Sequence, residues 1–192
     1  MRNIVFGLLL LALSFSAWGQ DETEGEKKGF QKERLFVGGN FGLTFGNYTL
    51  INISPQVGYR FTDFFAAGLG INGQYISVKS YFTNGQEYSR TSQGVTGLNV
   101  FGRIYPVDQI MIQVQPEANY VFGNIKYYDG RSPDKIKLDA VIAPSLLLGG
   151  GAVLPAGRGS FIASVFYDVL QHKNSPYGAR PIYNFGYNIS LQ

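Results

Sequence analysis

Three residues near the end of the chain have the types needed for hydrolytic chemistry. Asp168, His172 and Ser175 occur within one short stretch, and a carboxylate, an imidazole and a hydroxyl are the groups that a catalytic triad combines. Their order and spacing match no hydrolase motif, and His172 is the only histidine in the sequence. We therefore predict that the protein has no catalytic residues.

The composition excludes most other active-site chemistry. The 192 residues include no cysteine, which excludes thiol catalysis, disulfide bonds and cysteine zinc sites. One histidine is too few for most metal centres, so we expect neither a bound metal nor a cofactor. The formal net charge of +3 is too small to indicate a nucleic-acid partner.

The first 19 residues have the pattern of a secretory signal peptide. Arg2 precedes an apolar run over residues 4–13, and the small residues Ala17 and Gly19 suit the cleavage site. The run is shorter than the roughly 20 residues that a membrane-spanning helix needs, which argues against an anchor. We predict cleavage before Gln20, followed by a charged, solvated lead-in over residues 20–34.

From Leu35 onward, apolar and polar residues alternate with a period of two. This alternation predicts β-strands with one apolar face. The predicted strands cover residues 35–45, 51–61, 65–74, 98–105, 110–122, 138–148, 161–169 and 183–191. Short turns at 62–64, 106–109 and 153–160 alternate with longer polar connections at 77–93, 123–137 and 170–181, and only the connection at 47–49 breaks this rule.

The two faces of these strands differ in a way that is typical of membrane barrels. One face is apolar with aromatic residues near the strand ends, and the other carries Asn, Gln, Gly, Ser, Arg and Glu. A transmembrane β-barrel has an apolar band toward lipid, aromatic girdles, a polar interior and connections of unequal length. A soluble ligand-binding barrel is the alternative.

Several segments carry a resemblance to a known family. Val57–Phe61, Phe101–Pro106 and Phe166–Leu170 are similar to segments of the small outer-membrane β-barrel proteins of Gram-negative bacteria, which are often grouped as the porin family. The resemblance covers about residues 35–192, and it implies an all-β fold, an eight-stranded antiparallel up-and-down transmembrane β-barrel. It also implies an outer-membrane location after secretion, with residues 20–34 as a periplasmic lead-in. Members usually end in an aromatic residue, whereas this sequence ends in Gln192.

The inward face would hold charges that need partners. An eight-stranded barrel is filled by its own side chains, and an isolated charge at membrane depth is very costly. We predict that Glu117 accepts a hydrogen bond from an arginine, directly or through an intermediate, while amide side chains complete the network. The predicted network comprises Arg60, Asn99, Arg103, Gln113, Gln115 and Glu117. A selectivity constriction or a proton path is the alternative.

The longer connections concentrate basic and aromatic residues. Basic side chains at an outer rim can pair with phosphates of lipopolysaccharide, and aromatic ones add contact area for a partner. The residues concerned are Lys79, Tyr81, Arg90, Lys126, Tyr127, Tyr128, Arg131, Lys135, Lys137, Lys173 and Arg180.

These observations predict a structural or surface-interaction protein with a filled interior. The expected partners are outer-membrane lipid, lipopolysaccharide, the outer-membrane assembly machinery and an unidentified surface ligand. A narrow porin or small-solute channel is one alternative, and an enzyme that modifies outer-leaflet lipid is a second.

Overall fold

The fold is described by a computed structural model that covers residues 31–130 and 134–191. The predicted signal peptide and most of the predicted lead-in, as well as Arg131 and Gln192, lie outside the described residues. A single turn of 3-10 helix at Lys32–Arg34 precedes the first strand. No helix within the described residues is long and apolar enough to cross a membrane.

Eight strands make up the described chain, in agreement with the number predicted from the alternation. They are β1 (Leu35–Thr44), β2 (Tyr48–Arg60), β3 (Phe65–Tyr81), β4 (Glu87–Val107), β5 (Ile110–Tyr127), β6 (Lys135–Ala156), β7 (Gly159–Asp168) and β8 (Ile182–Ser190). Each strand pairs with its sequence neighbour in antiparallel fashion. β1 also pairs with β8, so the sheet closes into a ring. The predicted all-β, antiparallel, up-and-down arrangement is therefore confirmed.

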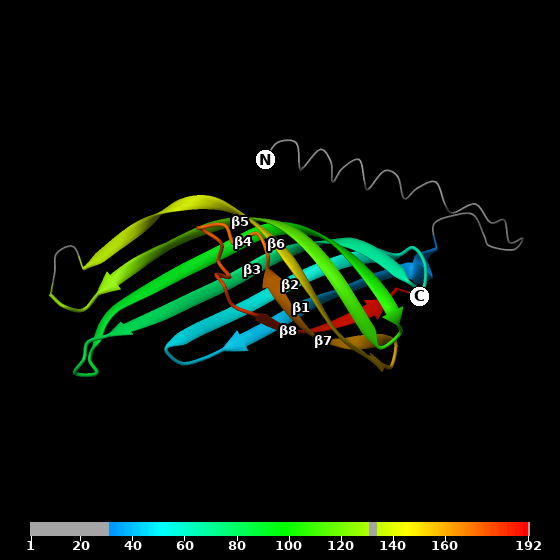
Figure 1. Ribbon diagram of the computed structural model, residues 1–192, viewed down its shortest axis with the longest axis horizontal. Helices are drawn as coiled ribbons and strands as arrows, with labels where there is room; N and C mark the ends of the chain where they lie inside the picture. The colour runs from blue at the N-terminus through cyan, green and yellow to red at the C-terminus, as the bar shows by residue number, and fades with distance from the viewer. Residues whose placement is uncertain (1–30, 131–133, 192) are drawn as a thin grey trace, which may run out of the picture. The chain divides into compact units, whose positions relative to one another are not determined.

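The strands differ greatly in length, which the sequence pattern did not predict. β3 to β6 contain 17, 21, 18 and 22 residues, whereas β1, β7 and β8 contain 10, 10 and 9. In Figure 1 the green and yellow strands β3 to β6 extend well past the ends of β1, β7 and β8. We call this extension the tall wall, and it comprises residues 74–81, 87–95, 121–127 and 135–142.

Two connections that were predicted from the sequence are shorter in the structure, because the strands of the tall wall extend into them. Residues 77–93 and 123–137 are mostly strand, and the connections themselves cover only 82–86 and 128–134. The outward face of these strand ends is largely polar, as at Lys79, Arg90 and Lys126, so the apolar outward face that marks the strands in the sequence ends while backbone pairing continues. The predicted turn at 153–160 is also shorter, because β6 extends to Ala156 and β7 begins at Gly159.

The interior of the ring contains two apolar clusters. The larger one includes Phe36, Phe101 and Phe166, and the smaller one consists of Ile76, Val95, Val121 and Ala143. Glycine provides the space that the aromatic rings occupy. A Cβ on Gly68 would lie 2.5 Å from Cζ of Phe101 and 2.3 Å from the carbonyl oxygen of Val57, which is far closer than atoms can pack.

Candidate functional site: a polar network inside the ring

The exposure of the two strand faces is the reverse of that in most water-soluble proteins. On β5, the inward side chains Gln113 and Glu117 are 1% and 6% exposed, whereas the outward Ile112 is 49% exposed. All eight strands expose a large apolar residue to a similar or greater degree. Examples are Phe41, Ile53, Leu69, Leu98, Ile112, Ile142, Phe161 and Phe185. The ring therefore has an apolar outer surface, and its interior contains many polar side chains beside the two apolar clusters.

A chain of hydrogen bonds follows the inner face of β5. The Arg103 guanidinium on β4 donates through Nε to Gln113 Oε1, and Gln113 in turn donates to Gln115. Gln115 Nε2 then donates to Glu117 Oε1 over 2.6 Å. A cation and an anion are thus connected through two amides.

No direct contact joins Arg103 to Glu117. The register of β4 and β5 sets Arg103 opposite Gln113 and sets Glu117 opposite Asn99. The two charged residues are therefore several positions apart along the strands, and the intermediate amides connect them. The prediction that Glu117 accepts from an arginine holds only in its indirect form.

Glu117 accepts hydrogen bonds from three different side chains. Besides Gln115, Asn119 Nδ2 donates to Oε2 over 2.9 Å, and the hydroxyl of Tyr177 donates to the same oxygen over 2.6 Å. Tyr177 also accepts a hydrogen bond of 2.8 Å from Gln74 Nε2. Several donors around one carboxylate are the arrangement that a buried anion needs.

Three asparagines extend the network across neighbouring strands. Asn99 Nδ2 donates to Asn72 Oδ1 over 2.7 Å, and Asn72 donates to Asn119 Oδ1 over 3.1 Å. Because Asn119 contacts Glu117, the predicted member Asn99 joins the network through two residues that the prediction did not include. All three asparagines are buried.

Arg103 has two further partners inside the ring. Its Nη2 donates to Gln56 Oε1 over 2.9 Å, and its guanidinium carbon lies 4.5 Å from the centroid of the Phe101 ring. Burial lets both contacts stabilise the cation, because hydrogen bonds and cation–π attraction are stronger away from water.

Arg60 is the one predicted network residue that the structure places elsewhere. It is the last residue of β2, and its guanidinium carbon lies 4.5 Å from the centroid of the Tyr105 ring. It lines a cavity of about 440 Å³ near the turn between β6 and β7. Arg60 thus lies beyond the large apolar cluster that contains Tyr105, and the lumenal network contains one arginine.

The connection between β7 and β8 is anchored to the inside of the ring by polar contacts. Ser175 Oγ donates to Asp168 Oδ2 over 2.6 Å, and Tyr177 reaches Glu117 as described. The other Asp168 oxygen accepts from the backbone N–H groups of Leu146 and Leu170. In Figure 1 this segment, in orange and red, crosses beside the long strands β4 to β6.

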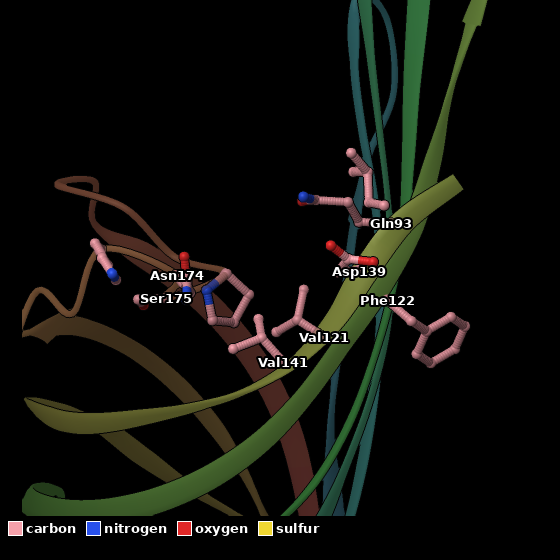
Figure 2. A pocket seen from close by; sticks show the side chains of 10 residues that line it. Gln93, Val121, Phe122, Asp139, Val141, Asn174 and Ser175 are labelled. Carbon is pink, nitrogen blue, oxygen red and sulfur yellow. The ribbon is translucent and has the colours of Figure 1, made fainter. Parts of the chain in front are cut away.

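A cavity of about 300 Å³ separates the β7–β8 connection from the tall wall. Figure 2 shows Val121 and Val141 pointing toward the segment with Asn174 and Ser175, whereas Phe122 points to the opposite side of the sheet. Neighbouring residues of β5 thus face the interior and the exterior in turn, up to the level of Phe122.

Sequence reasoning missed several members of the network. Asn72, Gln56, Gln74 and Asn119 stand at inward positions of the alternation, so the pattern itself could have identified them. Tyr177 lies in a connection, where no periodicity indicates which side chains enter the ring. Its contact with Glu117 depends on the folded path of that connection.

The predicted basic and aromatic residues lie mainly on strands rather than on loops. Only Tyr128, Lys173 and Arg180 of the described members lie in connections. The others are on the tall wall or at its edge: Lys79 and Tyr81 on β3, Arg90 on β4, Lys126 and Tyr127 on β5, and Lys135 and Lys137 on β6.

The three residues considered for hydrolytic chemistry do not form a triad through their hydrogen bonds. Ser175 donates to Asp168, and His172 Nδ1 accepts a backbone hydrogen bond of 3.3 Å from Asn174. In a triad the serine would donate to the histidine.

Among the residues that the structure describes, no group of three or more metal-binding side chains occurs. No model of a known protein family matches the sequence. No curated protein is significantly similar to it.

Proposed function

We propose that this chain is an integral outer-membrane β-barrel whose interior is filled by its own side chains. The reversed exposure of the strand faces carries this proposal. A continuous apolar surface around a ring would promote aggregation in water, whereas lipid is the favourable environment for it. A closed ring also suits a membrane, because neighbouring strands satisfy the backbone groups that lipid cannot.

The outer membrane of a Gram-negative bacterium is the membrane that fits best. The predicted signal peptide at residues 1–19 and the family resemblance over 35–192 support secretion followed by insertion. In this setting outer-membrane lipid, lipopolysaccharide and the outer-membrane assembly machinery are the proposed partners.

The proposed role is structural or surface-interacting, not transport. The path through the ring is interrupted by the large apolar cluster, by the network from Arg103 to Glu117 and by Tyr177. An eight-stranded barrel has no room for a channel beside such side chains. Steady, discrete openings in planar bilayers would instead favour the narrow porin.

We also propose that the protein is not an enzyme. The hydrogen bond from Ser175 to Asp168 supports a structural role for this pair in holding the β7–β8 connection. Replacing His172 by Ala is expected to leave the lipid composition of the membrane unchanged in mass spectra, and altered acylation would overturn this point.

The membrane assignment can be tested with the unmodified protein. It is expected to fractionate with outer membranes and to migrate differently on gels before and after boiling, because a folded barrel resists unfolding by detergent. Recovery as soluble periplasmic material, without heat-modifiable mobility, would contradict the proposal.

A further inference from the structure

The strand register aligns four basic residues in one row across the tall wall. Lys79 on β3 lies opposite Arg90 on β4, Arg90 lies opposite Lys126 on β5, and Lys126 lies opposite Lys135 on β6. Residues directly opposite each other in an antiparallel sheet project from the same face. We call these four residues the basic row.

The basic row is on the outward face of the ring. Lys126 has the same parity on β5 as Tyr120 and Phe122, which are 47% and 45% exposed, and the opposite parity to the inward Glu117. Lys126 and Lys135 are exposed, while Lys79 and Arg90 are half-buried beside their neighbours. The row therefore continues the surface that the proposed function places in lipid.

Like charges directly opposite one another destabilise a sheet. Strands are about 4.8 Å apart, so the row spans about 14 Å with basic side chains at every step. Glu87 accepts from Nε and Nη2 of Arg90 over 2.8 and 2.9 Å and also interacts electrostatically with Lys79. Asp129 and Asp134 lie in the connection beyond the row.

The height of the row above the apolar band identifies the ligand chemistry. Four residues lead from Phe122 to Lys126, which is about 13 Å along a strand and about 10 Å along the membrane normal at the usual tilt. Headgroups begin at the edge of the hydrocarbon, and lysine side chains can extend along the wall toward them. This is the level of lipid phosphates.

An aromatic ring lies next to the middle of the row. The Tyr128 ring centroid is 5.2 Å from Lys126 Nζ and 5.9 Å from the Arg90 guanidinium carbon. These contacts orient two neighbouring cations on the outward face, where they can bind one anionic group together.

We infer that the basic row is a binding site for phosphate groups of outer-leaflet lipopolysaccharide. This inference rests on the proposed function, because the row faces a headgroup only if the ring is embedded in lipid. It goes further by assigning the site to one side of the ring, the outward face of β3 to β6.

The test compares two charge-matched double variants. Lys126→Gln with Lys135→Gln removes two members of the row, and Lys32→Gln with Arg158→Gln removes the same charge from exposed residues at the opposite end of the ring. Each refolded protein is titrated in neutral detergent with lipopolysaccharide and with its dephosphorylated form, and complexes are measured by native gel shift. Heat-modifiable mobility confirms that each variant is folded.

The row variant is expected to bind lipopolysaccharide at least tenfold more weakly, and the control variant within twofold of the original. Dephosphorylated lipid should bind all three proteins equally weakly, and Lys126→Arg with Lys135→Arg should retain binding. Equal binding by the row and control variants would overturn the inference, as would full competition by millimolar inorganic phosphate. In either case heat-modifiable mobility would leave the membrane assignment intact.

Discussion

The hydroxyl of Tyr177 donates a 2.6 Å hydrogen bond to Glu117, although 60 positions separate the two residues in the sequence. Glu117 is on β5 and Tyr177 is in the β7–β8 connection. This contact joins a connection that would otherwise lie at the rim to the centre of the polar network. It makes the β7–β8 connection part of the hydrogen-bond network that contains Arg103 and Glu117.

Glu117→Gln is expected to destabilise the folded protein. The carboxylate accepts from Gln115, Asn119 and Tyr177, and an amide would turn an NH₂ group toward some of these donors. Leaving a buried donor unsatisfied costs about 1–3 kcal/mol, so thermal unfolding in detergent should occur at lower temperature. Glu87→Gln is the control because its partner Arg90 is at the surface. Unchanged melting with altered bilayer conductance would favour the channel alternative.

Tyr177→Phe is expected to loosen the β7–β8 connection. The variant loses the hydrogen bonds to Glu117 and Gln74 but keeps the ring. Trypsin should then cleave faster after Lys173, which lies four residues before Tyr177 in this connection; Arg180 precedes Pro181, and trypsin does not cleave that bond. Tyr183→Phe, at a residue that is 67% exposed, is the matched control. Equal cleavage rates in the two variants would argue against a role for the hydroxyl in anchoring.

The same tyrosine predicts a loss of stability at alkaline pH. Burial, together with the nearby Glu117 carboxylate, raises the pKa of Tyr177 well above its usual value. The unfolded chain loses this proton near pH 10, while the folded protein retains it. The contribution of the protonated Tyr177 phenol to folding stability is therefore complete below pH 10. It is lost as the pH rises toward the raised pKa.

Melting temperatures between about pH 9 and pH 11 test this expectation. The original protein should lose more stability over this range than Tyr177→Phe, which has no phenol to titrate at this position. Parallel curves for the two proteins would contradict it.

Gly68→Ala is expected to destabilise the ring by overpacking. The added methyl group would lie 2.3 Å from the Val57 carbonyl oxygen and 2.5 Å from the Phe101 ring, and overpacking typically costs about 1–3 kcal/mol. At Gly102 the nearest atom to a new Cβ is 3.7 Å away, so Gly102→Ala is the control and should be tolerated. Comparable denaturation of both variants would show that backbone preference matters more than space.

Much of the fold could be predicted from the alternation, and the exceptions have physical causes. Residues such as Ile112, Gln113 and Val114 alternate so clearly that strand and face follow directly. Around Ser77 and Lys79 the outward residues become polar, so the apolar outward face by which the strand is recognised in the sequence ends before the strand does. The extra length of β3 to β6 depends on pairing between strands, which the sequence of one strand does not reveal.

The candidate site was predictable to a similar extent. Arg103, Gln113 and Glu117 could be assigned to the interior from parity alone. The position of Arg60 beside Tyr105, and the entry of Tyr177 into the ring, depend on where strand ends and connections come to lie.

The two amides between Arg103 and Glu117 also have an electrical consequence. A proton wire needs groups that gain and lose protons in turn, and the amide of glutamine holds both hydrogens firmly at neutral pH. Gln113 and Gln115 therefore block proton transfer between the cation and the anion. The ring can therefore hold opposite charges in its interior without a path for protons between them.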